Sequence, residues 1–200
     1  MTSRFLSIVA LLLLLTSCKE SSSPDRMETA DTPENKELSL AEQVAEKYGR
    51  TAWKDVTELD FTFNVARNGD TISSRAWSWR PKTNDVRLVS RGDTVSYKRS
   101  NLGDSLALST DRGFINDVYW LLPHFKLVWD EDATISYPKP NLISISYGEE
   151  GGYTPGDRYD ITIDDQLLLT SWDYLPAGKT EPVMSTSFTN YKEIGGLLFA

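Results

Sequence analysis

Residues 59–79, LDFTFNVARNGDTISSRAWSW, decide the fold of this chain. Apolar residues alternate with polar ones in the first half of this stretch, at Leu59, Phe61, Phe63 and Val65. Such a period of two is typical of a strand with one buried face. The Asn68-Gly69 pair favours a tight hairpin turn, and the chain returns through residues 72–79. A long antiparallel hairpin is the prediction.

The rest of the body extends this meander on both sides of a helical interruption. Further strands are predicted at 86–89, 94–97, 134–137, 142–147, 158–163, 167–174 and 183–191. Ser39 and Glu42 form a capping box for an amphipathic helix that ends at Gly49. A more apolar helix is predicted between Asp111 and Trp129, with its stripe of apolar residues before Pro123. About nine strands and two helices indicate an α+β fold that is mostly antiparallel β.

The first residues have the pattern of a bacterial lipoprotein leader. Arg4 precedes an apolar run at residues 5–15, which is shorter than the roughly 20 residues that span a bilayer. Thr16 and Ser17 follow, then Cys18, the only cysteine of the chain, and this order resembles the lipobox cut by the lipoprotein signal peptidase. We expect cleavage between Ser17 and Cys18 and acyl chains such as palmitate on Cys18. An ordinary signal peptide cut near Ser17 is the alternative.

Residues 19–37 are rich in Ser, Pro, Asp, Glu, Lys and Thr, which is typical of a flexible tether. Three segments are therefore expected: a signal peptide at 1–17, a lipidated cysteine with its tether at 18–38, and a single domain at 39–200. Lys19 stands where an aspartate would resemble an inner-membrane retention signal, so we expect an anchor in the outer membrane. The apolar end, residues 195–200, is expected to form a last edge strand or to mark a truncated reading frame.

Composition excludes several classes of partner and reaction. The net charge is −8, and no cluster of Lys and Arg is present, which disfavours binding to nucleic acid. Catalysis by a nucleophile and a histidine base would depend on His124, the only histidine, and the sequence has no Gly-x-Ser-x-Gly motif. A zinc site is equally short of ligands. We expect no enzymatic activity, no metal and no cofactor.

Two resemblances bear on the fold. The order of helix, meander, inserted apolar helix and second meander resembles the periplasmic lipoprotein carriers and their outer-membrane receptor. That resemblance implies an open half-barrel with the inserted helix as a lid. Residues 119–123 (YWLLP), 125–127 (FKL) and 154–159 (TPGDRY) are similar to a family of uncharacterised Bacteroidota lipoproteins. Members of that family usually continue past the Gly195-Gly196 pair with another strand.

The aromatic residues suggest a binding site. We predict that a cavity between the sheet and the apolar helix is lined by Phe61, Phe63, Trp77, Trp79, Trp120 and Trp172. Such a cavity suits a lipid or an acyl chain. Arg158 and Tyr159 follow a glycine-rich loop and are candidates for its rim, although Arg158 pairing with a neighbouring carboxylate is an equal alternative. In the competing hypothesis the same rings fill a closed core, and the chain is a structural or partner-binding envelope lipoprotein.

Acidic pairs and triplets occur at predicted turns, at residues 130–132, 149–150 and 164–165. They could supply carboxylates for calcium or for attack on a glycoside. Turns exposed to water are the interpretation that we favour. The sequence does not indicate an oligomeric state.

Overall fold

The computed structural model describes residues 37–150 and 153–200. Strands make up 41% of these residues and helices 22%, so the domain is α+β and mostly β, as the sequence predicts. The predicted signal peptide, Cys18 and the tether up to residue 36 lie outside the described residues. No helix in the described part of the chain is long and apolar enough to cross a membrane.

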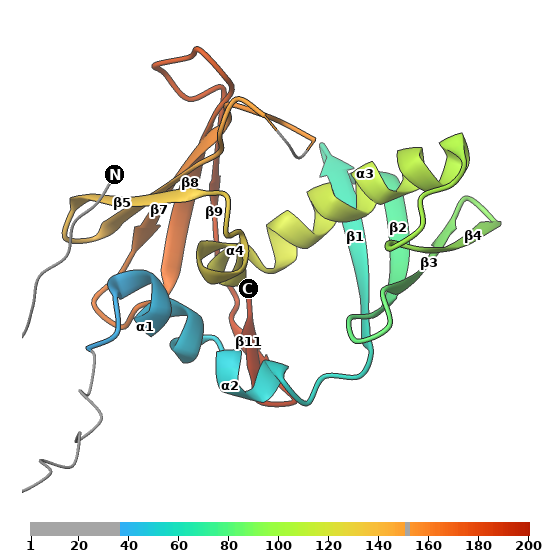
Figure 1. Cartoon of the computed structure of the whole chain (residues 1–200), viewed down its shortest axis with the longest axis horizontal. Coiled ribbons are helices and arrows are strands. Elements are labelled where there is room, and N and C mark those ends of the chain that lie inside the picture. The colour runs from blue at the N-terminus through green and yellow to red at the C-terminus, as the bar shows by residue number, and fades with distance from the viewer. Residues whose placement is uncertain (1–36, 151–152) are drawn as a thin grey trace, which may run out of the picture. The chain divides into compact units, whose positions relative to one another are not determined.

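The first four strands form one antiparallel sheet in chain order (Figure 1). They are β1 (Leu59–Arg67), β2 (Asp70–Arg80), β3 (Asp85–Ser90) and β4 (Asp93–Lys98). The predicted hairpin is confirmed, because Arg67 pairs with Asp70 across Asn68 and Gly69. These two turn residues have φ angles of 54° and 89°, as a type I′ turn requires.

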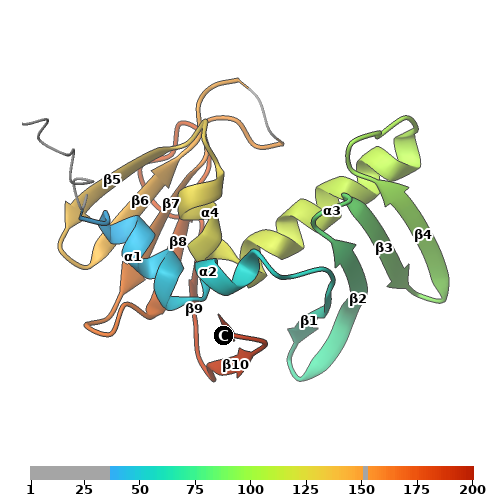
Figure 2. The ribbon, with the colours of Figure 1, turned by 60° about the horizontal axis from the view of Figure 1, so that its bottom comes forward.

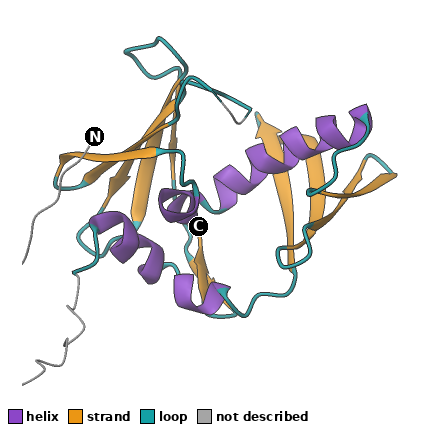
Figure 3. Cartoon of the chain, viewed as in Figure 1, coloured by secondary structure: helices purple, strands orange, loops and turns teal. Residues whose placement is uncertain are grey.

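The second sheet contains the next five strands, again antiparallel and in chain order. They are β5 (Thr134–Lys139), β6 (Leu142–Ser146), β7 (Arg158–Ile163), β8 (Leu169–Leu175) and β9 (Met184–Ser187). Neither sheet closes into a barrel. These nine strands thus form two open sheets. Figure 3 shows the strands of the two sheets in two groups with a helix between them.

The end of the chain differs from the prediction of a single strand at residues 183–191. Strand β9 ends at Ser187, and Asn190 turns the backbone with a φ of 59°. The hydroxyl of Tyr191 donates a hydrogen bond to the Leu169 carbonyl at 2.6 Å, so this residue contacts β8 through its side chain. Strands β10 (Lys192–Ile194) and β11 (Leu197–Phe199) then form a separate hairpin. The expected last strand is confirmed as β11.

Helix α1 (Leu40–Lys47) begins at the predicted capping box. The Ser39 hydroxyl accepts the Glu42 amide hydrogen at 3.3 Å, and the Glu42 carboxylate accepts the Ser39 amide hydrogen at 2.9 Å. A short helix that the sequence does not predict, α2 (Arg50–Trp53), follows Gly49. Gly49 has a φ of 91°, and a side chain there would collide with the Gly196 carbonyl oxygen. Only glycine fits this position.

The predicted helix between Asp111 and Trp129 is two helices, α3 (Ser105–Leu121) and α4 (Pro123–Trp129). Helix α3 begins before Asp111 because the Asp104 side chain caps it, accepting the Ala107 amide hydrogen at 2.7 Å. Pro123 lacks the N–H that would continue α3, and it becomes the first residue of α4.

Helix α3 packs along one face of the first sheet (Figure 2). Phe114 on α3 is fully buried, and its ring lies 5.4 Å from the ring of Trp77 and 5.3 Å from that of Trp79. Both pairs meet edge to face, which is a favoured geometry for aromatic rings. These contacts form a dry core between β2 and α3.

Two buried carboxylates of α3 attach the helix to the same sheet. Asp117 accepts two hydrogen bonds from the Arg75 guanidinium, both at 2.6 Å, and one from the Trp77 indole at 2.8 Å. Asp111 accepts hydrogen bonds from Arg99 at 2.8 Å and from the Tyr97 hydroxyl at 3.1 Å. The pairing with Asp117 raises the pKa of Arg75. Asp117 thus links α3 to β2. Asp111 links it to Tyr97 in β4 and to Arg99, which follows that strand.

Replacing Asp117 with Asn tests the first of these links. The free energy of unfolding should fall by roughly 2–4 kcal/mol, because Arg75 loses its counter-charge and one acceptor is replaced by an amide. Chemical denaturation measures the change. Asp70→Asn, at the exposed acid that begins β2, is the control and should stay within about 0.5 kcal/mol of the unmodified protein. Equal midpoints for the two variants would contradict the role assigned to Asp117.

Candidate functional site

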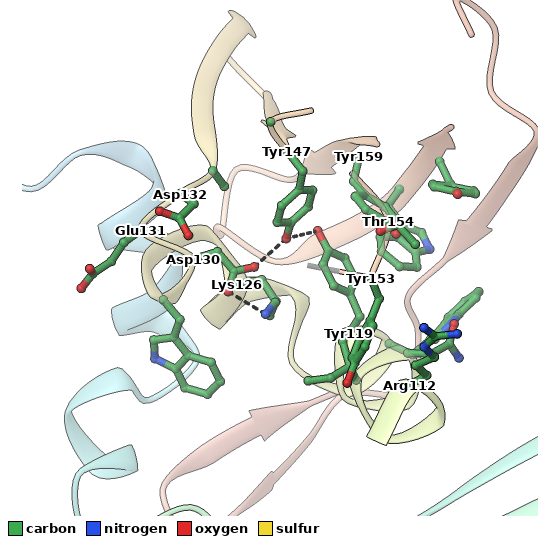
Figure 4. A pocket seen from close by; sticks show the side chains of 18 of the residues that line it. Arg112, Tyr119, Lys126, Asp130, Glu131, Asp132, Tyr147, Tyr153, Thr154 and Tyr159 are labelled. Carbon is green, nitrogen blue, oxygen red and sulfur yellow. Dashed lines mark hydrogen bonds and ion pairs between the residues drawn. The ribbon is translucent and has the colours of Figure 1, made fainter. Parts of the chain in front are cut away.

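A cavity of about 620 Å³ lies beside α4, where the end of α3 meets the second sheet. Its wall combines α3, α4 and the turn after α4 with strands β7 and β8 and the chain after β6. Eight aromatic side chains line it: Tyr119, Trp120, Trp129, Tyr147, Tyr153, Tyr159, Trp172 and Tyr174. We call this the aromatic cavity, and Figure 4 shows it from close by.

Parallel rings form the largest part of the wall. The Tyr159 ring lies 4.3 Å from Tyr119, 4.8 Å from Trp172 and 5.0 Å from Tyr174, with interplanar angles of 28° or less. Tyr159 pairs with Tyr174 across β7 and β8. Because alternate residues of a strand point to the same face, Trp172 lies on that face too. Tyr119, in the last turn of α3, covers these rings from the other side.

A hydrogen-bonded group of polar side chains forms the adjoining part of the wall. The two carboxylate oxygens of Asp130 accept hydrogen bonds from Lys126 Nζ and from the Tyr147 hydroxyl, each at 2.6 Å. The hydroxyls of Tyr147 and Tyr119 lie 3.3 Å apart (Figure 4). Burial raises the pKa of both tyrosines, and the bond to Asp130 raises that of Tyr147 further. Both phenols therefore remain neutral near pH 7.

The rim is built from α3 and from the chain that follows β6. Tyr153 donates a hydrogen bond from its hydroxyl to Asp111 at 2.8 Å. The Arg112 guanidinium lies over the Tyr153 ring, 5.4 Å from its centroid. Asp111 also pairs with Arg99, so one carboxylate both holds Tyr153 at the rim and attaches α3 to the end of the first sheet.

Three of the residues predicted for the binding site line the aromatic cavity, namely Trp120, Tyr159 and Trp172. Phe61 lines a second cavity of about 470 Å³, which lies beside the β10–β11 hairpin. Phe63 packs against Trp120, with ring centroids 6.1 Å apart. The structure thus brings three of the eight predicted residues to the wall of one cavity.

The other predicted residues have structural surroundings. Trp77 and Trp79 belong to the core against Phe114. Arg158 makes the ion pair considered as the alternative, with its nitrogens 3.1 Å from the oxygens of Asp160. Ligand binding itself stays a prediction for all eight residues.

Sequence reasoning predicted Tyr159 but missed the other tyrosines of the cavity and its partly buried ion pair between Lys126 and Asp130. Tyr174 stands two residues after Trp172 on one strand, and that spacing already placed it on the same face. Tyr119, Tyr147 and Lys126 carried no comparable signal, because only the docking of the helices brings them to the sheet. The acids at 130–132 and 149–150 do lie in turns or bends, yet four of them, Asp130, Glu131, Asp132 and Glu150, line the cavity. In the described residues no group of three or more His, Cys, Asp or Glu could hold a metal ion.

Comparisons of the chain with protein-family models, with curated proteins and with solved structures find no match. The two resemblances drawn from the sequence stay predictions.

His124 lies away from the aromatic cavity, in the core. Its side chain stacks on the Tyr48 ring with centroids 4.0 Å apart, and only 2% of the residue is exposed. Its Nε2 atom has no hydrogen-bond partner among the described residues. Burial lowers the pKa of His124 well below its usual value, so the imidazole is neutral near pH 7. A residue without access to the cavity does not serve as a base there.

This burial makes the stability of the domain depend on pH. The unfolded chain takes up a proton at His124 near pH 6.5, while the folded protein resists it, so the free energy of unfolding falls as the pH drops below about 6.5. One such group contributes a slope of at most about 1.4 kcal/mol per pH unit. Urea unfolding of the protein and of His124→Phe, at roughly pH 7.5 and pH 5.5, should show a smaller loss for the variant. Parallel losses in the two proteins would rule out His124 as the titrating group.

Proposed function

We propose that this chain is a lipid-anchored protein of the cell envelope that binds a lipid or an acyl chain in the aromatic cavity. The acyl chains on Cys18 hold it at the outer membrane, and the tether spaces the domain from the bilayer. The observation that carries the binding role is a cavity of about 620 Å³ with eight aromatic side chains in its wall.

The size and lining of the cavity support this role. Binding sites for small molecules usually have volumes of about 300–1,000 Å³ and mostly apolar walls with a few polar groups. Protein cores, in contrast, leave few voids larger than a water molecule. The core around Phe114 in this protein is filled in that way. An open volume between α3, α4 and the second sheet therefore supports a site rather than a packing fault.

A buried donor in the wall supports a ligand with an acceptor atom. Trp172 is 2% exposed, and its indole N–H has no hydrogen-bond partner in the described part of the chain. A buried donor without a partner costs about 1–3 kcal/mol. The ester carbonyl of a lipid is an acceptor that can offset this cost.

Anchoring and ligand binding belong together in this proposal. A chain attached to the membrane through two or three acyl groups stays at the surface, whereas one group binds only marginally. The described domain starts at Glu37, near the end of the predicted tether. A tether of that composition lets the domain reach lipids near the bilayer surface.

Cys18→Ala tests the anchor. The native chain should incorporate labelled palmitate and partition into detergent, while the variant should do neither and should keep residues 5–15 as uncleaved precursor. Ser21→Ala, inside the predicted tether, is the matched control and should be labelled like the native chain. Mass spectrometry that finds an unmodified residue other than Cys18 at the mature terminus would falsify lipidation.

Ala133→Trp tests the cavity. Ala133 lines it and is partly buried, so an indole at this position fills part of the volume. The neutral dye N-phenylnaphthylamine should bind the native domain saturably at micromolar concentration, and a monoacylglycerol should displace it. Affinity should fall about tenfold or more in Ala133→Trp, because the ligand loses its place. Ala66→Trp puts the same ring on an exposed part of β1 and should bind like the native protein.

Absence of saturable dye binding to the folded native domain would remove the lipid role. The competing proposal, a structural or partner-binding lipoprotein, would then be preferred.

A further inference from the structure

We propose that the aromatic cavity selects ligands with a cationic head group, so that its lipid carries an ammonium at the polar end. This inference rests on the proposed lipid binding and specifies the chemistry of the ligand. It follows from the charges and the aromatic ring faces around the cavity.

The basic side chains of the cavity are largely neutralised by the protein itself. Lys126 is bonded to Asp130, and Arg99 is bonded to Asp111, with N–O distances of 2.6 and 2.8 Å. Arg112 is the only lining base without a carboxylate partner among the described residues. It is exposed, and its guanidinium already lies over the Tyr153 ring.

The acidic side chains of the rim are not neutralised. Glu131, Asp132 and Glu150 line the cavity, are exposed, and make no ion pair with any described residue. The cavity lining thus has three carboxylates and one guanidinium without an ion-pair partner among the described residues, which leaves an excess of negative charge. The net charge of the whole chain is also negative, at −8. The field at the mouth of the cavity attracts cations and repels a carboxylate or phosphate head group.

The aromatic wall has the same preference. Ring faces are electron-rich and attract a cation that lies within about 6 Å of the centroid. Two of the protein's own cations occupy such positions here, since Lys126 Nζ lies 5.8 Å from the Tyr119 centroid and Arg112 lies over Tyr153. A quaternary or primary ammonium at the rim beside Glu131 and Asp132 is attracted by these carboxylates and by the electron-rich rings of the same cavity.

The location of the charges also separates the two ends of the ligand. The rings of Trp172 and Tyr119 are buried, whereas Glu131, Asp132 and Glu150 are exposed. An apolar tail therefore lies against the rings, and the ammonium remains at the water boundary, where its desolvation costs least.

A series of competitors with one tail and three head groups tests this inference on the intact domain. Dodecyltrimethylammonium, monododecanoylglycerol and dodecanoate, all below their micelle concentrations, compete against N-phenylnaphthylamine near pH 7.5. At low salt the ammonium should bind about tenfold more tightly than the carboxylate, with the glycerol ester between them. Added salt should narrow this difference because the rim is exposed to solvent.

A double variant, Glu131→Gln with Asp132→Asn, should reduce the difference between the ammonium and the carboxylate to about threefold or less, because two carboxylates at the rim lose their charge. The control, Asp165→Asn with Glu181→Gln, removes the same charge from exposed positions outside the cavity and should keep the full difference. The two variants have equal net charge, so they separate a local effect from attraction to the whole chain.

Each outcome has one meaning. Equal affinity for the three competitors, tighter binding of dodecanoate, or the same loss in both double variants would overturn the cationic preference while lipid binding stands. Failure of all three competitors and of the dye would instead remove the proposed function.

Discussion

The two hydrogen bonds between Arg75 and Asp117 hold α3 on the first sheet, and the position of α3 determines where the cavity lies. A buried carboxylate is costly unless it is paired and fully hydrogen-bonded, so Asp117 permits only those positions of the helix in which Arg75 and Trp77 reach it. Tyr119 follows two residues later, about 200° around an α-helix, and therefore points toward the second sheet, where it stacks on Trp172 at 5.2 Å. One helix serves both sheets, and the residues that anchor it on one side place the cavity wall on the other.

Local signals made the elements of the first sheet predictable. The Asn68-Gly69 turn requires positive φ at both residues, and few residue types tolerate it, so the hairpin could be placed from the sequence alone. The capping box at Ser39 is equally local. The division of the strands into two sheets has no such signature, because it depends on how helices at residues 105–129 pack against strands far away in the chain. The start of α3 was missed for a related reason. Its first turn carries little of the apolar stripe and is defined by the cap at Asp104.

The candidate site was predictable only in part. The sequence does not indicate whether a given aromatic side chain packs in a filled core or lines a cavity. Trp77 and Trp172 are equally buried, at 2% exposure. Trp77 meets Phe114 edge to face in a filled core, whereas Trp172 lines an open volume. The difference arises from the partner across the contact, which is set by the tertiary structure. The acids at residues 130–132 are a second example. The sequence predicts that they lie at a turn, but it does not predict that they line a cavity with aromatic rings.

The cavity remains open because its wall resists collapse. A void lined by flexible apolar side chains can shrink when neighbours relax into it, at a cost that varies with the site. Here Asp130 holds Lys126 and Tyr147 through charge-assisted hydrogen bonds of 2.6 Å, and moving either inward would break a bond in a poorly solvated place. The Tyr159 ring is stacked against Tyr119 of α3 and Trp172 of β8, and these contacts restrain its plane. The hydrogen-bonded polar group and the stacked aromatic group meet at Tyr119, so each restrains the other and the wall as a whole resists collapse.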